Sequence, residues 1–242
     1  MEPTITEITH LKKSFGNNHV LNDINLKIKK GENLVVLGKS GSGKSVLIKC
    51  LVSLMEPDEG KIILLGEDIS LLKESELNLL RKKVGFLFQS AALYDSMTVR
   101  ENLEFPLRDI KSKPKEEIDA LVIEALKNVG LEEAIDKMPS ELSGGMRKRI
   151  GLARTLILKP EIILYDEPTT GLDPITSKEI SHLILDVQKK YNTASIIITH
   201  DIECARLTAN HMILIKEGIV VAEGTFKEIS ESTDEWIRSF FN

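Results

Sequence analysis

The segment "VLGKSGSGKS" (Val36–Ser45) decides the fold of this chain. It stands between an apolar run, "NLVVLG", and a segment with helical spacing, "SVLIKCLVSL". Gly38 to Ser45 fit G-x-x-x-x-G-K-[ST] in the context that this pattern requires, after a strand and before a helix. The glycines let successive backbone N–H groups point at the oxygens of a phosphate. The pattern predicts a phosphate-binding loop, and the alternative is a flexible Gly/Ser turn that matches by chance.

Each residue of the loop has an expected part in binding a nucleoside triphosphate. The N-terminus of the following helix adds positive partial charge. Lys44 is expected to place its ammonium at the β- and γ-phosphates, and Ser45 to offer its hydroxyl to Mg²⁺. The other residues of the loop are expected to surround the phosphates: Gly38, Lys39, Ser40, Gly41, Ser42 and Gly43.

Two further apolar runs, "IILYDE" and "SIIITH", end in polar side chains. Such runs are typical of buried parallel strands, whose carboxyl ends form the ligand-binding edge of an α/β sheet. Asp166 is expected to reach the Mg²⁺ shell through water, while Glu167 orients and deprotonates the attacking water. His200 is expected to bind the γ-phosphate, although a lone histidine is usually structural. Gln89, after "VGFLF", has an amide that suits both metal and water.

A second glycine pair follows a serine at the start of another predicted helix, in "ELSGGMRKRIGLARTLI". Ser143 can cap this helix, and Gly144 and Gly145 leave N–H groups open to an anion. Because the first loop already encloses the phosphates of one nucleotide, we expect the second receptor to serve a nucleotide on another copy, in a two-fold head-to-tail pair. A surface helix cap without a ligand explains these residues almost as well.

The order of the patterns predicts an α/β fold in a single domain, 1–242. Near the start, apolar and polar residues alternate as in half-buried strands, and strands then alternate with helices in the first and last thirds. Residues 90–159 are predominantly helical, and "KEEIDALVIEALKNVGL" has a near 3.6-residue period with Gly130 as its expected C-cap. The core is therefore expected to comprise 1–89 and 160–242, with 90–159 as an inserted helical subdomain.

Composition argues against several classes of protein. A net charge of -5 disfavours a nucleic-acid-binding chain, which needs a surplus of Lys and Arg. Cys50 and Cys204 lack metal or redox spacing and are expected to be buried free thiols. The first residues do not have the pattern of a signal peptide, and no apolar run approaches the ~20 residues of a membrane span. We expect a protein that is neither secreted nor membrane-spanning.

Taken in order, these motifs resemble the ATP-binding cassette subunits of ABC transporters over essentially the whole chain. The resemblance implies a RecA-like P-loop core with an N-terminal antiparallel β subdomain, ATP and Mg²⁺ as cofactors, and a homodimer closing around two ATP. It also implies that Phe15 stacks on adenine, for which a core role is the alternative, and that Asp173 belongs to the D-loop at the nucleotide. The motifs are the Walker A loop (Gly38 to Ser45), the Q-loop (Gln89), the signature (Leu142 to Met146), Walker B with its glutamate (Asp166, Glu167), the D-loop (Gly171 to Pro174) and the H-loop (His200).

The resemblance also implies where such a subunit works. It would bind transmembrane permease subunits on the cytoplasmic face of the inner membrane. "GMRKRIGLARTL", "LFQSAALYDSMTVRENLEFPL" and "PSELSGG" are similar to the Mla-type ATPases, which move lipid with MCE-domain proteins. In that family Glu104, Phe105 and Pro106 would face the membrane partner. Met146 departs from the family pattern, in which Gln is usual. Other cargo, in an importer or exporter, and a soluble ABC ATPase that acts on ribosomes or DNA remain alternatives.

Overall fold

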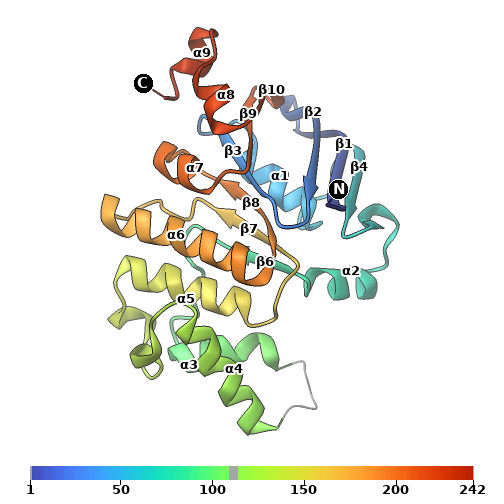
Figure 1. Cartoon of the computed structure of the whole chain (residues 1–242). Helices are drawn as coiled ribbons and strands as arrows, with labels where there is room; N and C mark the ends of the chain where they lie inside the picture. Colours follow the sequence, from blue (N-terminus) through green and yellow to red (C-terminus); the bar gives the residue numbers. More distant parts are fainter. Residues whose placement is uncertain (1, 109–113, 242) are drawn as a thin grey trace.

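One layer of β-strands runs through the molecule, with helices on both of its faces (Figure 1). The structure is a computed structural model and describes residues 2–108 and 114–241. Within these residues the strands form one ten-stranded sheet. In spatial order its strands are β5 (Glu67–Asp68), β4 (Glu59–Leu64), β1 (Thr4–Phe15), β2 (Asn18–Lys29), β10 (Ile219–Gly224), β9 (His211–Lys216), β3 (Asn33–Gly38), β8 (Ala194–Ile198), β7 (Ile162–Asp166) and β6 (Val84–Leu87).

The N-terminal strands are antiparallel, as the alternation of their residues predicts. β1 pairs antiparallel with both β2 and β4, and the turn between β1 and β2 places Gly16 at φ +59°. A single parallel pair, Ile219 with Asp23, joins β10 to β2 and so connects this antiparallel part with the rest of the sheet.

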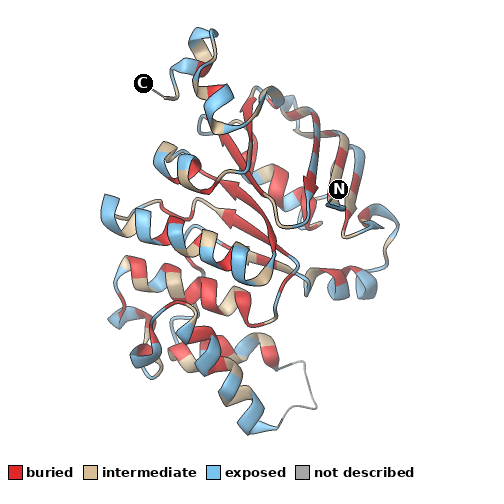
Figure 2. Ribbon diagram, viewed as in Figure 1, coloured by how far each residue is buried: buried red, intermediate tan, exposed pale blue. Residues whose placement is uncertain are grey.

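The central strands are parallel and buried on both faces, which confirms the expected α/β core. β9, β3, β8, β7 and β6 run parallel to one another. Successive residues of a strand point to opposite faces, so Leu34 and Val36 belong to one hydrophobic cluster and Val35 and Leu37 to another. The red strands in the middle of Figure 2 show this burial. All four parallel strands from β3 to β6 therefore have their carboxyl ends at one edge.

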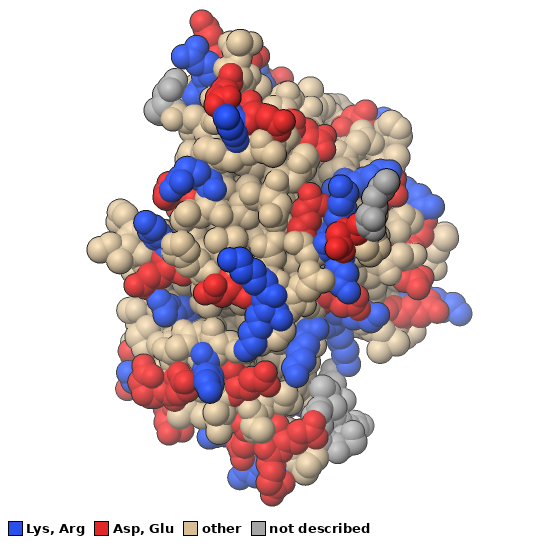
Figure 3. All heavy atoms as spheres, in the orientation of Figure 1, with Lys and Arg blue, Asp and Glu red and all other residues tan. Residues whose placement is uncertain are grey.

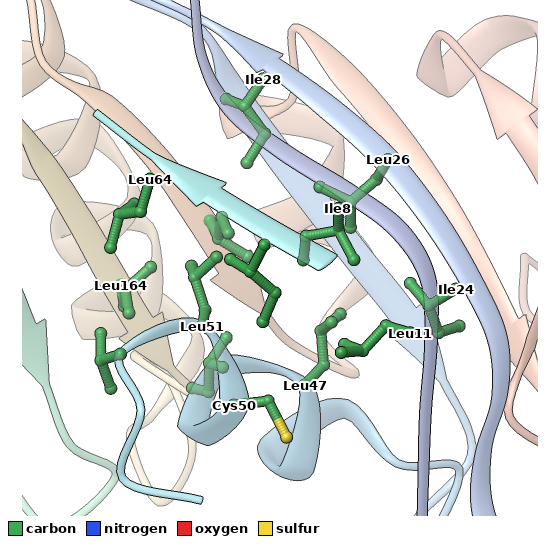
Figure 4. Close-up of a cluster of buried hydrophobic side chains, with 14 of the residues drawn as sticks. Ile8, Leu11, Ile24, Leu26, Ile28, Leu47, Cys50, Leu51, Leu64 and Leu164 are labelled. Carbon is green, nitrogen blue, oxygen red and sulfur yellow. The ribbon is translucent and has the colours of Figure 1, made fainter. Parts of the chain in front are cut away.

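Helices pack against both faces of the sheet. Helix α1 (Lys44–Leu51) lies between the antiparallel and parallel strands, and Leu47, Cys50 and Leu51 point into a cluster with Ile8 and Leu11 of β1 (Figure 4). Cys204 is also buried, and both thiols are free, as expected. The other helices outside the central segment are α2 (Glu74–Arg81), α6 (Pro174–Tyr191), α7 (Ile202–Thr208), α8 (Phe226–Ser230) and α9 (Glu235–Arg238), with the 3₁₀ turn η1 (Ile69–Leu71).

The central segment is helical and has its own hydrophobic cluster, which includes Val99, Val122 and Ile150. Its longest early helix ends at Lys127, and Gly130 closes it as the sequence predicts. Gly130 has a φ of +65°, its N–H donates to the carbonyl oxygen of Lys127 at 3.3 Å, and the N–H of Leu131 donates to that of Leu126 at 3.1 Å. The elements are α3 (Val99–Glu104), α4 (Lys115–Lys127) and α5 (Gly144–Leu156), with 3₁₀ turns η2 (Phe105–Leu107), η3 (Glu132–Ala134) and η4 (Pro139–Glu141).

Candidate active site

The Gly38–Ser45 loop joins β3 to α1 in a conformation that depends on glycine. Gly41 and Gly43 have φ of +82° and +100°, which L side chains rarely adopt. A Cβ on Gly43 would lie 2.7 Å from the carbonyl oxygen of Val20, and one on Gly38 would lie 2.5 Å from Ser42 Oγ. That hydroxyl is buried and has no hydrogen-bond partner among the described residues. The loop therefore fits a phosphate group, which would supply acceptors that the chain itself does not.

A cavity of about 720 Å³ opens beside this loop. Gly38–Gly41 and Gly43–Val46 line it from the loop and the first turn of α1. Gln89, Glu167 and His200 reach the same cavity from the ends of β6, β7 and β8. The carboxyl ends of four neighbouring parallel strands thus bring together the residues that the sequence predicted at one edge of the sheet.

Lys44 is buried, with only 7% of its surface exposed. Its Nζ donates to the carbonyl oxygens of Gly38 at 2.7 Å and Lys39 at 3.0 Å. Burial lowers the pKa of the ammonium, and the negative charges of Glu167 and Asp166 oppose this decrease. The loop's own carbonyls therefore hold a cation at the wall of the cavity.

Ser45 and Asp166 lie together at the position where a divalent cation is expected. Ser45 Oγ donates to Asp166 Oδ1 at 3.4 Å. Burial raises the pKa of Asp166, and the charge of the adjacent Glu167 adds to the increase. A cation beside a hydroxyl and a carboxylate would relieve this repulsion, and oxygen donors of this kind suit Mg²⁺. The donor set therefore fits Mg²⁺, with the Gln89 amide as a further oxygen on the wall of the same cavity.

Glu167 and His200 form a contact across the ends of β7 and β8. Glu167 Oε2 lies 2.7 Å from His200 Nδ1 and accepts from Thr170 Oγ1 at 3.1 Å. Glu167 has a left-handed φ of 51°, so the strand ends at Asp166 and simple alternation does not set the direction of the second carboxylate. Glu167 therefore lines the cavity and contacts His200, whereas Asp166 meets Ser45.

The signature residues do not line this cavity. Ser143 is the N-cap of α5, and its Oγ accepts from the N–H of Met146 at 3.2 Å. Gly145 is buried against α6, where a Cβ would lie 2.5 Å from Thr176 Cγ2, whereas Gly144 has ordinary space for one. Asp173 likewise acts as a helix cap, accepting from the N–H groups of Ile175 and Thr176 at 3.0 Å.

Phe15 lies at the end of β1 and is 47% exposed. This exposure contradicts the alternative of a core role. The ring is outside the lining of the cavity, and the Nζ of Lys13 stands 5.7 Å from its centroid. Adenine stacking by Phe15 stays a prediction, made for a flat ring that is open to solvent.

Four side chains of this region were missed from the sequence, one of them Val46, which follows the phosphate loop directly. Val20 of β2 and Phe240 near the C-terminus line the cavity, and no local sequence pattern predicts either contact. Lys148 of α5 donates from Nζ to the carbonyl oxygen of Glu167 at 3.0 Å. Its spacing from Gly145 and Leu152, three and four residues away, is a signal that places Lys148 on the buried face of the helix.

Comparisons with known proteins agree with this geometry. Residues 21–170 match the family model described as ABC transporter. The chain belongs to the ABC transporter family, as an ATP-binding subunit. Among the described residues, every helix is too short or too polar to cross a bilayer.

Three individual members of the family illustrate the similarity. The chain is 42% identical over 98% of its length to the "Probable ribonucleotide transport ATP-binding protein mkl" of Mycobacterium tuberculosis, and it spans 66% of that protein. It is 38% identical over 97% of its length to the "Intermembrane phospholipid transport system ATP-binding protein MlaF" of Haemophilus influenzae, and it spans 89% of that protein. The ATP-binding cassette MJ0796, solved as a dimer in a post-hydrolysis state with ADP and Pi, superposes with a TM-score of 0.83 at 33% identity, over 91% of this chain and 98% of that one.

Proposed function

We propose that this chain is the ATP-hydrolysing subunit of an ABC transporter. The observation that carries the proposal is the convergence of Lys44, Ser45, Gln89, Glu167 and His200 on one cavity beside a glycine loop. Each of these side chains has a part in hydrolysing a phosphoanhydride. The chain binds ATP in this cavity and releases ADP and phosphate.

Each side chain has a separate task in this reaction. Lys44 binds the β- and γ-phosphates, and Ser45, Gln89 and Asp166 would hold Mg²⁺. When bound, the ion neutralises charge on the phosphate oxygens. Glu167 accepts a proton from the attacking water, since its carboxylate lines the cavity.

His200 orients both partners of the reaction. Its Nδ1 contacts Glu167, and the other ring nitrogen, Nε2, can bind the γ-phosphate. The side chain is largely exposed, at 66%, so the opposite ring nitrogen is accessible to a ligand. A ring bound on both sides holds one orientation, which aligns the carboxylate and the phosphate for attack.

Two copies of the chain form each ATP site. The signature residues Ser143, Gly144 and Gly145 lie outside the cavity of their own chain, and Asp173 caps α6 near them. In a two-fold pair they meet the nucleotide held by the other copy. ATP then contacts both copies only in the closed pair and shifts the equilibrium towards closure, and loss of the γ-phosphate reopens it. The dimeric arrangement of the structural relative MJ0796 supports this assembly.

Permease subunits on the cytoplasmic face of the inner membrane receive this motion. Three aromatic side chains of the segment after β6 are exposed: Phe88 at 38%, Tyr94 at 42% and Phe105 at 36%. The Tyr94 and Phe105 rings lie 4.6 Å apart, beside Glu104 and Pro106. Exposed aromatic side chains of this kind suit a protein interface. Acidic and basic side chains are intermixed on the face shown in Figure 3, which favours an interface with a permease over binding to nucleic acid.

The cargo of the transporter is phospholipid, moved in an Mla-type system with an MCE-domain protein. The similarity to MlaF over most of both chains supports this choice. The similarity to mkl, whose name gives ribonucleotide transport, favours another cargo as the second candidate. A soluble ABC ATPase without a permease is the third.

Two measurements test the proposal in sequence. The purified chain should release phosphate from ATP only with Mg²⁺, and failure to bind or hydrolyse ATP would contradict the ATPase function. Affinity purification from detergent-solubilised membranes should then recover a permease with an MCE-domain protein and phospholipid. A solute-binding protein in their place would favour the second candidate, and recovery of ribosomes or DNA would favour the third.

A further inference from the structure

Helix α5 carries a buried lysine that contacts the backbone of the proposed general base. Lys148 is only 5% exposed, and its Nζ donates to the carbonyl oxygen of Glu167 at 3.0 Å. Lys148 follows the N-cap Ser143 by five positions, which is about 7.5 Å along a helix axis at 1.5 Å per residue. One helix therefore connects the exposed Ser143 with the end of strand β7.

The other contacts of Glu167 come from the carboxyl ends of β7 and β8. Its N–H donates to the carbonyl oxygen of Ile198 at 2.9 Å, its carbonyl oxygen also accepts from the N–H of Thr170 at 3.3 Å, and its carboxylate contacts Thr170 and His200. These partners follow or belong to strands of the parallel sheet. Glu167 has a left-handed φ of 51°, which a non-glycine residue keeps only when its surroundings hold it. Lys148 supports this backbone from a different element, the signature helix.

Because the charged side chain of Lys148 is buried, it depends on its hydrogen bond to the Glu167 carbonyl oxygen. Burial lowers the pKa of its ammonium to about 8, and the negative charges of Asp166 and Glu167 oppose the decrease. A buried ammonium is strongly unfavourable unless it keeps its hydrogen-bond partner. A shift of α5 must therefore either break the contact with the Glu167 carbonyl or move that backbone with it.

We propose that Lys148 is a positioning residue, whose hydrogen bond to the Glu167 carbonyl places the general base and transmits the position of the signature helix to it. The inference rests on the proposed function, in which the Ser143 end of α5 meets ATP held by the other copy. ATP held by the partner copy then determines the position of α5. Through Lys148, α5 determines the position of Glu167, which acts on the ATP held by its own copy. The two sites of the pair are linked through this helix.

Single substitutions separate positioning from ATP binding. Lys148→Met keeps an unbranched side chain and removes the ammonium, and we expect kcat to fall about tenfold or more because the base is misplaced. ATP affinity should change less than about twofold, because the contact is to Glu167 and not to the loop. Lys148→Arg should recover part of the lost kcat, and Lys189→Met, an exposed change on α6, should match wild type. An unchanged kcat in Lys148→Met overturns the inference. If that variant does not fold, Lys148→Gln takes its place in the same comparison.

A mixed pair shows whether Lys148 acts on the base of its own chain. Two differently tagged copies are co-purified, one with Glu167→Gln, so that only the other copy has a working base. Lys148→Met is then added either to the copy with the intact Glu167 or to the copy with Glu167→Gln. We expect turnover to fall only in the first arrangement, and equal turnover in both overturns the inference. An inactive wild-type protein would instead contradict the proposed ATPase function.

Discussion

The phosphate loop and the signature segment both place serine and glycine at the N-terminus of a helix, yet their surroundings differ. The first residues of α1 line the large cavity, together with side chains from three other strand ends. Ser143, at the start of α5, is exposed and lies outside that lining. The same local chemistry is therefore a complete site in one region and an incomplete one in the other.

The cause of this difference is the element to which each helix is attached. The phosphate loop continues a central strand, so the parallel sheet brings its neighbours' ends to the same place. Helix α5 instead packs on α6, where Gly145 approaches Thr176. Its N-terminus has the N–H groups of an anion site, but among the described residues it does not line the cavity of its own chain. We expect a second copy of the chain to supply the nucleotide that the N-terminus of α5 would bind.

The largest expected effect comes from Glu167→Gln, which preserves shape and removes the base. We expect ATP turnover to fall by about 10²- to 10⁴-fold, the usual contribution of general base catalysis. ATP should still bind, and the unhydrolysed nucleotide should hold the two regions together as a dimer on a sizing column. Phosphate release measures the first effect. Turnover at the wild-type rate would remove Glu167 from its proposed role.

The next effect compares the two regions within a single chain. Lys44→Ala removes the cation of the complete site, and ATP affinity should fall about 10- to 100-fold, as for the loss of a hydrogen bond to a charged group. Ser143→Ala should leave the affinity of the isolated chain unchanged, because its hydroxyl contacts Met146 and not the cavity. Binding of a fluorescent ATP analogue at a low protein concentration measures both. Equal losses in the two variants would mean that one chain contains both halves.

The sequence predicted the complete region better than the incomplete one. Gly38 to Ser45, Gln89, Glu167 and His200 could be placed together because apolar runs mark parallel strands, whose ends must meet at one edge. The left-handed backbone of Glu167 and the depth of Lys148 depend on packing between distant segments, which no short pattern records. The same limit applies to Phe240, which reaches the cavity from the C-terminal end. Local patterns thus identify functional residues, while tertiary contacts decide their orientation.

A smaller effect tests whether α6 holds the signature segment in position. Gly145→Ala should lower the free energy of unfolding by about 1–3 kcal/mol, since the added Cβ would lie 2.5 Å from Thr176 Cγ2. Gly144→Ala is the matched control and should stay within about 1 kcal/mol, because its Cβ has room and alanine favours a helix. Urea denaturation measures both. Equal stability of the two variants would show that α6 does not restrict this end of α5.

The smallest expected departure from wild type comes from combining the two regions in a mixed pair. One copy carries Lys44→Ala and the other Ser143→Arg, so each homodimer has two defective sites and should be nearly inactive. In the mixed pair both defects fall on the same composite site, and the other site joins an intact Lys44 to an intact Ser143. If the sites work independently, turnover should recover to about half of the wild-type value. Coupling of the sites through α5 would lower it further, since the intact site depends on a helix whose partner nucleotide is lost. A mixed pair no more active than the two homodimers, although assembled on a sizing column and able to bind one ATP, would contradict the shared site, because defects that each act within their own chain leave both sites of the mixed pair defective.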